Sequence, residues 1–304
     1  MSNGSNDERL TKNERREAAR AKAQQLREAQ RKKDRRTKIF LQGGIVLAAL
    51  AIIAVVAVVI VNSVRPAGPG PANMASDGVQ LTQGFEVTPT DALEAGEDPV
   101  PNEVEGDVID IQIYVDYLCP YCGLFEETNV DYIETLVESG AATLEVHPIS
   151  ILDRLSQGTR YPTRAANAAA CVAQEAPASF WDFHTSLFEN QPAENSTGLD
   201  DDQILDLAAD AGAESEALTT CVTDQTFRSW VGEATSRATT GPIPNTDDLN
   251  LQGTPLVLVD GEQYQGALDD ADAFRAFIVQ AAGETFSENS TPEPTEEPTE
   301  EPAP

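Results

Sequence analysis

Residues 108–122 read VIDIQIYVDYLCPYC, and the remaining elements of the fold are predicted from the strand and the helix start in these residues. Apolar and polar side chains alternate over residues 109–115, which predicts a β-strand. Residues 125–138 then place apolar side chains at helical spacing and end at Gly140, as a helix should. Residues 143–149 predict another strand. A strand, a helix and a second strand in this order form a βαβ unit, whose crossover helix makes the two strands parallel.

The sequence that follows predicts a helical insertion and a second half of the sheet. The apolar spacing becomes purely helical to about residue 240, with helices expected over 163–175, 178–190, 200–211 and 214–238. A strand over 255–259, a hairpin turn at Asp260 and Gly261, a strand over 262–265 and a helix over 271–282 complete a ββα half, and 79–87 could add an edge strand. We therefore expect an α/β fold whose βαβ and ββα halves enclose an all-helical insertion at about residues 160–240.

Two of the four cysteines, Cys119 and Cys122, form a C-x-x-C motif where the first strand passes into its helix. Between them, Pro120 suits the first helical turn, where its missing N–H is no loss, and Tyr121 follows it. The unpaired N–H groups and the positive end of the helix should stabilise Cys119 as a thiolate and lower its pKa below that of a free cysteine. Stabilising the reduced form in this way makes the disulfide form the stronger oxidant.

Two other interpretations of the motif are half of a zinc site and a purely structural disulfide. Zinc needs a second pair of ligands at matching spacing, whereas Cys171, Cys221, His147 and His184 are scattered along the chain. We therefore expect no metal, and the absence of a Gly-rich phosphate loop predicts no organic cofactor either. The aromatic surroundings of His184 favour a place in the core, and His147 is expected to be packed or at the surface. A structural brace stays open.

A second element of the candidate site is Gly253-Thr254-Pro255, directly before the strand predicted at 255–259. In the cis form, a proline at a strand start would offer an edge of backbone to an extended peptide. An ordinary loop proline is the alternative.

Residues 116–122 (DYLCPYC), the helical insertion and Gly253-Thr254-Pro255 together resemble the thioredoxin-fold thiol-disulfide oxidoreductases of the DsbA type. The resemblance implies a thioredoxin-like domain over residues 79–283. It implies that Cys119 is the attacking and attacked sulfur and Cys122 its buried partner. It further implies that Pro255 is a cis proline facing them, and that Thr254 tunes Cys119 and contacts substrate. A quinone-linked membrane protein is the implied reoxidase.

The chain departs from that family pattern at one position. Many relatives carry a buried carboxylate six residues before the first cysteine, and that position here is Ile113. Asp116 is nearer to the motif, but we expect it to be solvated at the strand end and assign it no role in proton transfer. The group that handles the proton is therefore left open.

The remaining cysteines, Cys171 and Cys221, fall in the first and last helices expected in the insertion. In an oxidising compartment a structural disulfide between them is the natural interpretation. Closing a loop of about 50 residues would contribute on the order of 4 kcal/mol. Two buried inert thiols, or a second redox pair, are the alternatives.

The amino-terminal part of the chain predicts a membrane anchor. Residues 1–38 hold 13 of the 20 Lys and Arg residues, and residues 40–61 are apolar apart from Gln42. As a helix, this apolar run of 22 residues would span roughly 33 Å, enough to cross a bilayer, and we expect a transmembrane helix over 39–61. The positive-inside rule places residues 1–38 in the cytoplasm and the folded domain outside. A cleaved signal peptide is the alternative. Residues 62–78 are rich in Pro and Gly and predict a linker.

Charge and composition narrow the function further. The 304 residues carry a formal net charge of −31, which argues against a nucleic-acid partner. Residues 284–304 are a Pro/Glu/Thr repeat and predict a disordered acidic tail. We expect a single-pass membrane protein whose extracytoplasmic domain oxidises cysteine pairs of exported proteins. A disulfide reductase or isomerase on the same fold, and a non-catalytic tethered binding module, are the alternatives.

Overall fold

The computed structural model describes residues 68–289 except 105, 107, 245 and 247, together with isolated helical residues among the first 66. The chain divides into two units, Met1–Pro66 and Ala67–Pro304. Among the described residues no helix is both long enough and apolar enough to cross a membrane. The predicted span at 39–61 lies almost entirely outside the described residues, as does most of the basic segment at 1–38, so both stay predictions.

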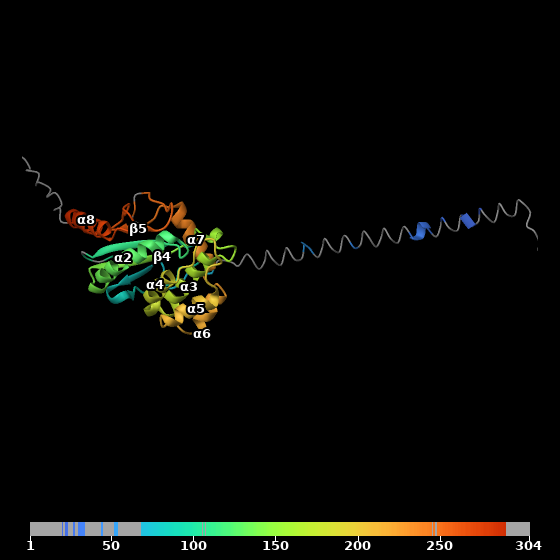
Figure 1. Ribbon diagram of the computed structural model, residues 1–304, viewed down its shortest axis with the longest axis horizontal. Coiled ribbons are helices and arrows are strands. Elements are labelled where there is room, and N and C mark those ends of the chain that lie inside the picture. The colour runs from blue at the N-terminus through green and yellow to red at the C-terminus, as the bar shows by residue number, and fades with distance from the viewer. Residues whose placement is uncertain are drawn as a thin grey trace, which may run out of the picture. The chain divides into compact units, whose positions relative to one another are not determined.

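The second unit is built on a six-stranded sheet in the order β2-β1-β4-β3-β5-β6 (Figure 1). β3 (Ile109–Val115) and β4 (Ala142–Pro148) lie parallel in its centre, and β5 (Leu256–Val259) runs antiparallel to β3. β6 (Glu262–Gln263) extends the sheet beyond β5, and β1 (Val79–Thr82) and β2 (Glu86–Val87) extend it beyond β4. The turn between β5 and β6 has positive φ at Asp260 and Gly261, as the hairpin interpretation requires.

Seven helices of the unit are described. α2 (Pro120–Ser139) crosses between β3 and β4, and α8 (Ala271–Asn289) follows β6. The helices between β4 and β5 are α3 (Tyr161–Glu175), α4 (Phe180–Glu189), α5 (Asp201–Asp210), α6 (Glu216–Thr223) and α7 (Arg228–Thr240). In Figure 1, α3 to α6 gather at the side of the molecule away from α8. The expected βαβ and ββα halves with an all-helical insertion are thus confirmed.

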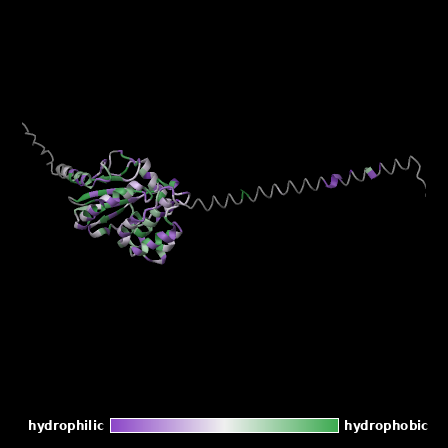
Figure 2. Cartoon of the chain, viewed as in Figure 1, coloured by the Kyte–Doolittle hydropathy of each residue, from purple (hydrophilic) through white to green (hydrophobic). Residues whose placement is uncertain are grey.

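Alternation along β3 divides the core between the two faces of the sheet. Ile111, Ile113 and Val115 belong to the main apolar cluster, which continues into α2, α8 and the insertion. Tyr114 points the other way, into a smaller cluster with Leu256, Leu258 and residues after α7. In Figure 2 the sheet is largely coloured hydrophobic, while purple is frequent on the outer helices. The sheet therefore holds the end of β3, and with it Cys119, against packed layers.

The structure corrects two predicted elements. The strand expected at 79–87 is broken by a short 3₁₀ turn, Gln83–Phe85, in which Gly84 and Phe85 both have positive φ. The first half of this stretch, β1, is not an edge strand of the sheet, because it pairs with both β2 and β4. The helix expected at 214–238 is two helices, α6 and α7. Gln225 has a positive φ at the break, and the side chain of Asn167 accepts the Phe227 N–H there instead of a helix carbonyl.

Two predicted boundaries also differ. The end of the Pro/Gly-rich segment packs on the domain, because the Gly70 N–H donates to Leu93 O and the Met74 side chain is only 2% exposed. A free linker cannot therefore extend to residue 78. At the other end, α8 continues to Asn289, so the first residues of the tail predicted at 284–304 are helical. Residues 290–304 lie outside the described part.

Candidate active site

Cys119 is the N-cap residue of α2, at the point where the chain leaves β3. Its backbone is extended, and its carbonyl accepts the N–H groups of Cys122 at 3.0 Å and Gly123 at 3.2 Å. Pro120 occupies the first helical turn, as its lack of an N–H allows. Both cysteines carry free thiols; Cys119 is 4% exposed and Cys122 fully buried. The C-x-x-C motif therefore begins a helix, and its first sulfur is the one nearer solvent.

The surroundings of Cys119 lower its pKa from 9.0 to about 6. The largest cause is a hydrogen bond from the Cys122 thiol, followed by one from the side chain of Thr254 and by the backbone N–H groups of Cys122 and Tyr121. Burial acts in the opposite direction, since it disfavours the thiolate. Several donors thus hold Cys119 as the anion near neutral pH.

Cys122 has the opposite electrostatics. Burial raises its pKa well above the ordinary value, and its hydrogen bond and charge interaction with Cys119 raise it further. The two sulfurs therefore ionise in a clear order, with Cys119 first. In a thiol-disulfide exchange this order makes Cys119 the better leaving thiolate and leaves Cys122 as the protonated partner.

Thr254 and Pro255 lie against this pair although they are more than 130 positions away in sequence. The Cys119 Sγ is 3.2 Å from the Thr254 carbonyl oxygen, and the Thr254–Pro255 peptide bond is cis. The position follows from the pairing of β5 with β3, in which Leu256 lies opposite Tyr114. The tertiary fold thus brings together all the residues proposed for redox chemistry: Cys119, Cys122, Pro120, Tyr121, Thr254 and Pro255.

Asp116 corrects the expectation of a solvated carboxylate, because its side chain is 0% exposed. Its two carboxylate oxygens accept the N–H groups of Leu118 and Leu152, each at 2.9 Å. Burial, the largest cause, raises its pKa to about 7, and the neighbouring charge of Cys119 adds to the increase. The sequence could not predict this burial, because the loop that contains Leu152 covers the end of β3 from 36 positions away.

Ile113 is packed in the main cluster opposite Val146 and Val257, as its apolar side chain dictates. Asp116 is therefore a buried carboxylate, close to the dithiol, that can exchange a proton near neutral pH. The sequence signal that could have found it was its position, three residues before Cys119 at the end of a buried strand.

A second buried polar group lies beneath the start of α2. The Tyr117 hydroxyl is 3.0 Å from His184 Nδ1, and His184 Nε2 is 3.4 Å from Glu126 Oε1. His184 is buried among aromatic rings, as expected, and packs against those of Trp181 and Phe188. His147 is buried as well, stacked on Tyr114 with ring centroids 4.1 Å apart. Neither histidine contacts the cysteine pair.

Sequence reasoning missed Gln191, which follows α4. Its side-chain Nε2 donates to the carbonyl oxygens of Cys119 at 2.9 Å and Tyr117 at 3.2 Å. The insertion is thereby tied to the backbone on both sides of Leu118. No local pattern indicates this contact, because it depends on how α4 packs against α2.

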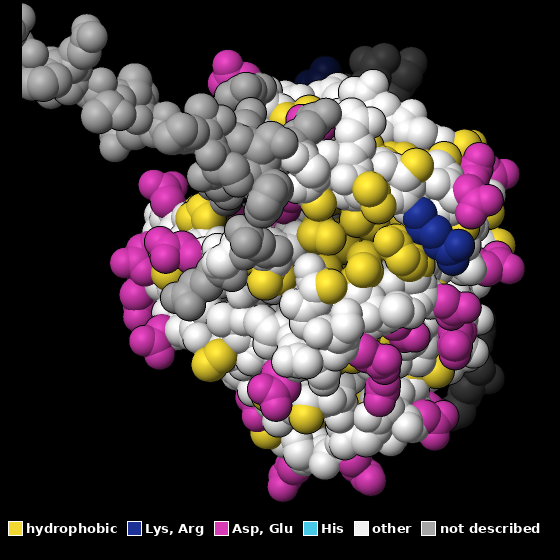
Figure 3. Space-filling view, turned by 90° about the vertical axis from the view of Figure 1, so that its left-hand side faces the viewer, with side chains coloured by type: hydrophobic (Ala, Val, Ile, Leu, Met, Phe, Trp, Pro, Cys, Tyr) yellow, Lys and Arg dark blue, Asp and Glu magenta, His cyan; other side chains and the backbone are white. Residues whose placement is uncertain are grey.

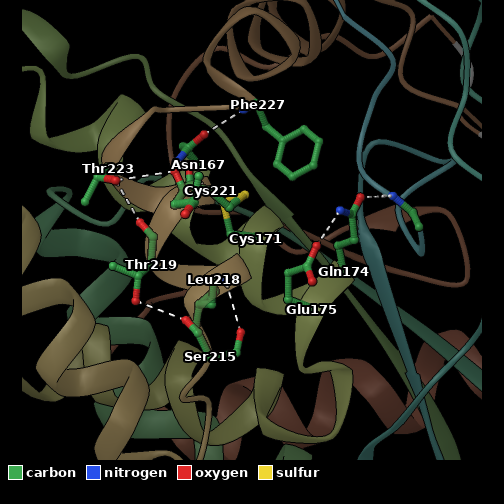
Figure 4. Close-up of a disulfide and its surroundings, with 12 residues drawn as sticks. Asn167, Cys171, Gln174, Glu175, Ser215, Leu218, Thr219, Cys221, Thr223 and Phe227 are labelled. Carbon is green, nitrogen blue, oxygen red and sulfur yellow. Dashed lines mark hydrogen bonds between the residues drawn. A yellow bond between two sulfur atoms is a disulfide. The ribbon is translucent and has the colours of Figure 1, made fainter.

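Cys171 and Cys221 form a disulfide between α3 and α6, with a Cα–Cα distance of 5.9 Å (Figure 4). Asn167, one turn before Cys171, is drawn beside the bond and donates to the Cys221 carbonyl at 3.5 Å. Cys221 lies in α6, the second-to-last helix of the insertion, because the helix predicted at 214–238 is divided into α6 and α7. Within the described residues, no group of three or more His, Cys, Asp or Glu side chains could hold a metal ion.

Comparison with known proteins places this site in a family. Residues 108–280 match a family model described as thioredoxin. The chain is 32% identical over 151 residues to the serine/threonine-protein kinase PknE of Mycobacterium tuberculosis, a match that covers 48% of this chain but 26% of the kinase. It is 27% identical over 156 residues to disulfide bond formation protein D of Bacillus subtilis, covering 51% of this chain and 64% of that protein. The chain thus spans less than two thirds of these curated relatives.

In the matches with solved structures, this chain covers nearly the whole length of the other protein. The reduced disulfide bond oxidoreductase DsbG of Mycobacterium tuberculosis matches with a TM-score of 0.51 and 27% identity, over 71% of this chain and 95% of that one. Oxidised DsbA of the same organism matches with a TM-score of 0.51 and 28% identity, over 70% of this chain and 100% of that one. BdbD of Bacillus subtilis matches with a TM-score of 0.50 and 20% identity, over 72% of this chain and 100% of that one, and this match supports the fold. These structural neighbours are thiol-disulfide oxidoreductases of the DsbA type. With more than half of its length matched by the family model, the chain belongs to the thioredoxin family.

Proposed function

We propose that this chain is a membrane-anchored thiol-disulfide oxidoreductase that introduces disulfides into exported proteins on the outer side of the membrane. The observation that carries the redox activity is the contrast within the motif, where donors lower the pKa of Cys119 to about 6 while burial raises that of Cys122. A disulfide that only braced the start of a helix would not need donors that stabilise its first sulfur as a thiolate.

The proposed reaction begins with the Cys119–Cys122 disulfide. A substrate thiolate attacks Cys119 Sγ, the Cys119–Cys122 bond breaks, and Cys122 leaves as a thiolate that takes up a proton. A second substrate thiolate then attacks the substrate sulfur of the mixed disulfide and displaces Cys119 as a thiolate. Two electrons have passed from the substrate to the enzyme. The site supports this course because Cys119 is stabilised as a leaving group and buried Asp116 can exchange a proton near it.

A further round requires an oxidant for the reduced pair. By resemblance to the DsbA type, we propose that a quinone-linked integral membrane protein removes the two electrons. An anchor at residues 39–61 would keep the domain near such a partner. Labelling of Cys119 in intact cells with a membrane-impermeant thiol reagent, after mild reduction, tests the location; an absence of labelling until the cells are lysed contradicts it.

The direction of the reaction separates an oxidase from a reductase or isomerase on the same fold. The stabilised Cys119 thiolate favours the oxidase, since it stabilises the reduced form. Equilibration of the purified protein in glutathione buffers measures the potential. A value well above that of thioredoxin, about −270 mV, supports the oxidase over a reductase, and a value at or below it contradicts this direction. The isomerase is tested separately, by the rate at which the reduced protein rearranges the wrong disulfides of a scrambled substrate.

A further inference from the structure

A long groove adjoins the reactive cysteine pair, between α2 and α4. Its volume is about 1140 Å³, and Pro120 and Tyr121 of the C-x-x-C motif line it. It follows α2 as far as Glu134, a rise of about 20 Å at ~1.5 Å per residue. About six residues of an extended polypeptide have that length. A substrate segment held there would have its cysteine beside Cys119.

The groove exposes apolar side chains next to the reactive sulfur. Tyr121 is 63% exposed and Leu124 is 36% exposed, and Val130 and Phe188 continue the apolar lining. A tyrosine offers a large contact area together with a polar hydroxyl, and such residues are enriched at interfaces. These surfaces suit contact with a polypeptide chain.

The walls of the groove are acidic. Five carboxylates line it, and none of its lining residues is Lys or Arg: Glu126, Glu127, Asp131, Glu134 and Glu189. Two of the five have partners inside the protein, since Glu126 contacts His184 and Glu134 accepts the Trp181 indole N–H at 2.9 Å. The other three are exposed. Within the described part of the chain, the ion pairs of Arg164, Arg237 and Arg275 are with other carboxylates.

The spacing of two of these exposed carboxylates is unfavourable for the helix itself. Glu127 and Asp131 are four residues apart on α2, where like charges repel and destabilise the helix slightly. Glu189 adds a third negative charge from the facing helix. The groove thus concentrates uncompensated negative charge beside an exposed aromatic ring and a reactive thiol, which is complementary to a cationic peptide.

We propose that the α2–α4 groove binds the stretch of client polypeptide next to its reactive cysteine and selects stretches that carry Lys or Arg. The proposal rests on the proposed thiol-disulfide exchange, and it names a client class for the same site. Cationic side chains within a few residues of the client cysteine pair with Glu127, Asp131 and Glu189, while Tyr121 and Leu124 contact the apolar parts. The attraction acts on the rate of association and weakens with added salt.

The experiment must separate the groove from the general charge of the molecule. Acidic side chains are spread over much of the surface, as the face in Figure 3 illustrates, and they attract any cation at long range. The groove variant therefore combines Glu127→Gln, Asp131→Asn and Glu189→Gln. Its matched control combines Asp202→Asn, Asp206→Asn and Asp210→Asn, three exposed positions of α5 that do not line the groove. Both variants change the net charge by the same amount.

The full-length protein in its Cys119–Cys122 disulfide form is mixed with nine-residue peptides that contain one central cysteine flanked by Lys, Ser or Glu. The second-order rate constant of mixed-disulfide formation is divided by that of the same peptide with bis(2-hydroxyethyl) disulfide, which removes the effect of flanking charge on the peptide thiol. We expect the Lys peptide to exceed the Glu peptide by about tenfold at low salt. The groove variant should lower this ratio severalfold, and the control should retain most of it.

The outcomes distinguish the two proposals. A ratio near one in the wild-type protein, a ratio that the groove variant leaves unchanged, or an equal loss in the control overturns the cationic selectivity while the exchange reaction itself stands. A faster reaction with uncharged apolar flanks than with Lys flanks also overturns it. If no peptide reacts, the proposed function fails first. Far-UV circular dichroism and urea denaturation of all three proteins show that the variants are folded.

Discussion

The two cysteine pairs of this chain are almost equally buried, yet their chemistry differs. Cys171 and Cys221 are 0% and 6% exposed, and Cys119 and Cys122 are 4% and 0% exposed. The first pair joins the bodies of two insertion helices across 50 positions, whereas the second lies at a helix start among hydrogen-bond donors. Burial therefore does not distinguish a structural pair from a redox pair. The donors around the sulfur do so, because they decide which of the two atoms carries a negative charge.

The largest effect expected from this contrast is on activity. Cys119→Ser should lower the oxidative refolding rate of a reduced substrate protein to its rate without enzyme, because serine forms no mixed disulfide. A Cys171→Ala, Cys221→Ala double variant keeps the redox site and should keep most of the activity at low temperature. Substantial activity in Cys119→Ser, measured by the appearance of native disulfides, would contradict the assignment of the redox pair.

The Cys171→Ala, Cys221→Ala variant should lose more stability than a variant that lacks the Cys119–Cys122 pair. Closing a loop of about 50 residues contributes on the order of 4 kcal/mol to the free energy of unfolding in the chain-entropy model. Urea denaturation followed by circular dichroism measures the loss against the wild-type protein. A Cys119→Ala, Cys122→Ala variant is the matched control, since a four-residue ring restricts the unfolded chain far less. Equal losses in the two variants would remove the distinction between the pairs.

The ionisation of Cys119 predicts a pH dependence. Its folded pKa of about 6 lies below the ordinary 9.0, so the folded reduced protein holds the thiolate where the unfolded chain holds a thiol. The stabilisation fades below pH 6, is about 1.4 kcal/mol at pH 7, and approaches about 4 kcal/mol above pH 9. Urea titrations of the reduced protein at several pH values measure it. The rate of alkylation by iodoacetamide should rise with a midpoint near pH 6, and a midpoint near 9 is the contrary result.

The smallest expected effect concerns Asp116. Its pKa of about 7 places a second ionisation in the same range, and its negative charge disfavours the thiolate of Cys119. Asp116 is mostly protonated at pH 6, so Asp116→Asn should leave the midpoint of alkylation almost unchanged and remove a shallow inflection near pH 7. Asp206→Asn, at an exposed carboxylate of α5 outside the groove, is the control. An unchanged alkylation profile in a folded Asp116→Asn protein would separate Asp116 from the redox pair.

Much of the fold could be predicted because its signals are local. Alternation in β3, the helical spacing of α2 and the positive φ of its C-cap Gly140 all act within a few residues. The errors arose where a distant contact overrode the local pattern. The predicted helix at 214–238 broke where Asn167, from α3, accepts the Phe227 N–H. A run of good helix-forming residues contains no sign of that partner.

For the redox site, the sequence alone predicts which residues would carry the chemistry, and the unpaired N–H groups at a helix start supply one of the reasons why Cys119 would ionise first. The folded chain brings Thr254 to Cys119, buries Asp116 beneath Leu152 and the core, and forms a groove between α2 and α4 beside the motif, and none of these contacts could be predicted from local patterns in the sequence. The physical reason is that hydrogen bonds within one turn depend on neighbouring residues. Burial, and the pKa that follows from it, depends on chain segments far away in sequence.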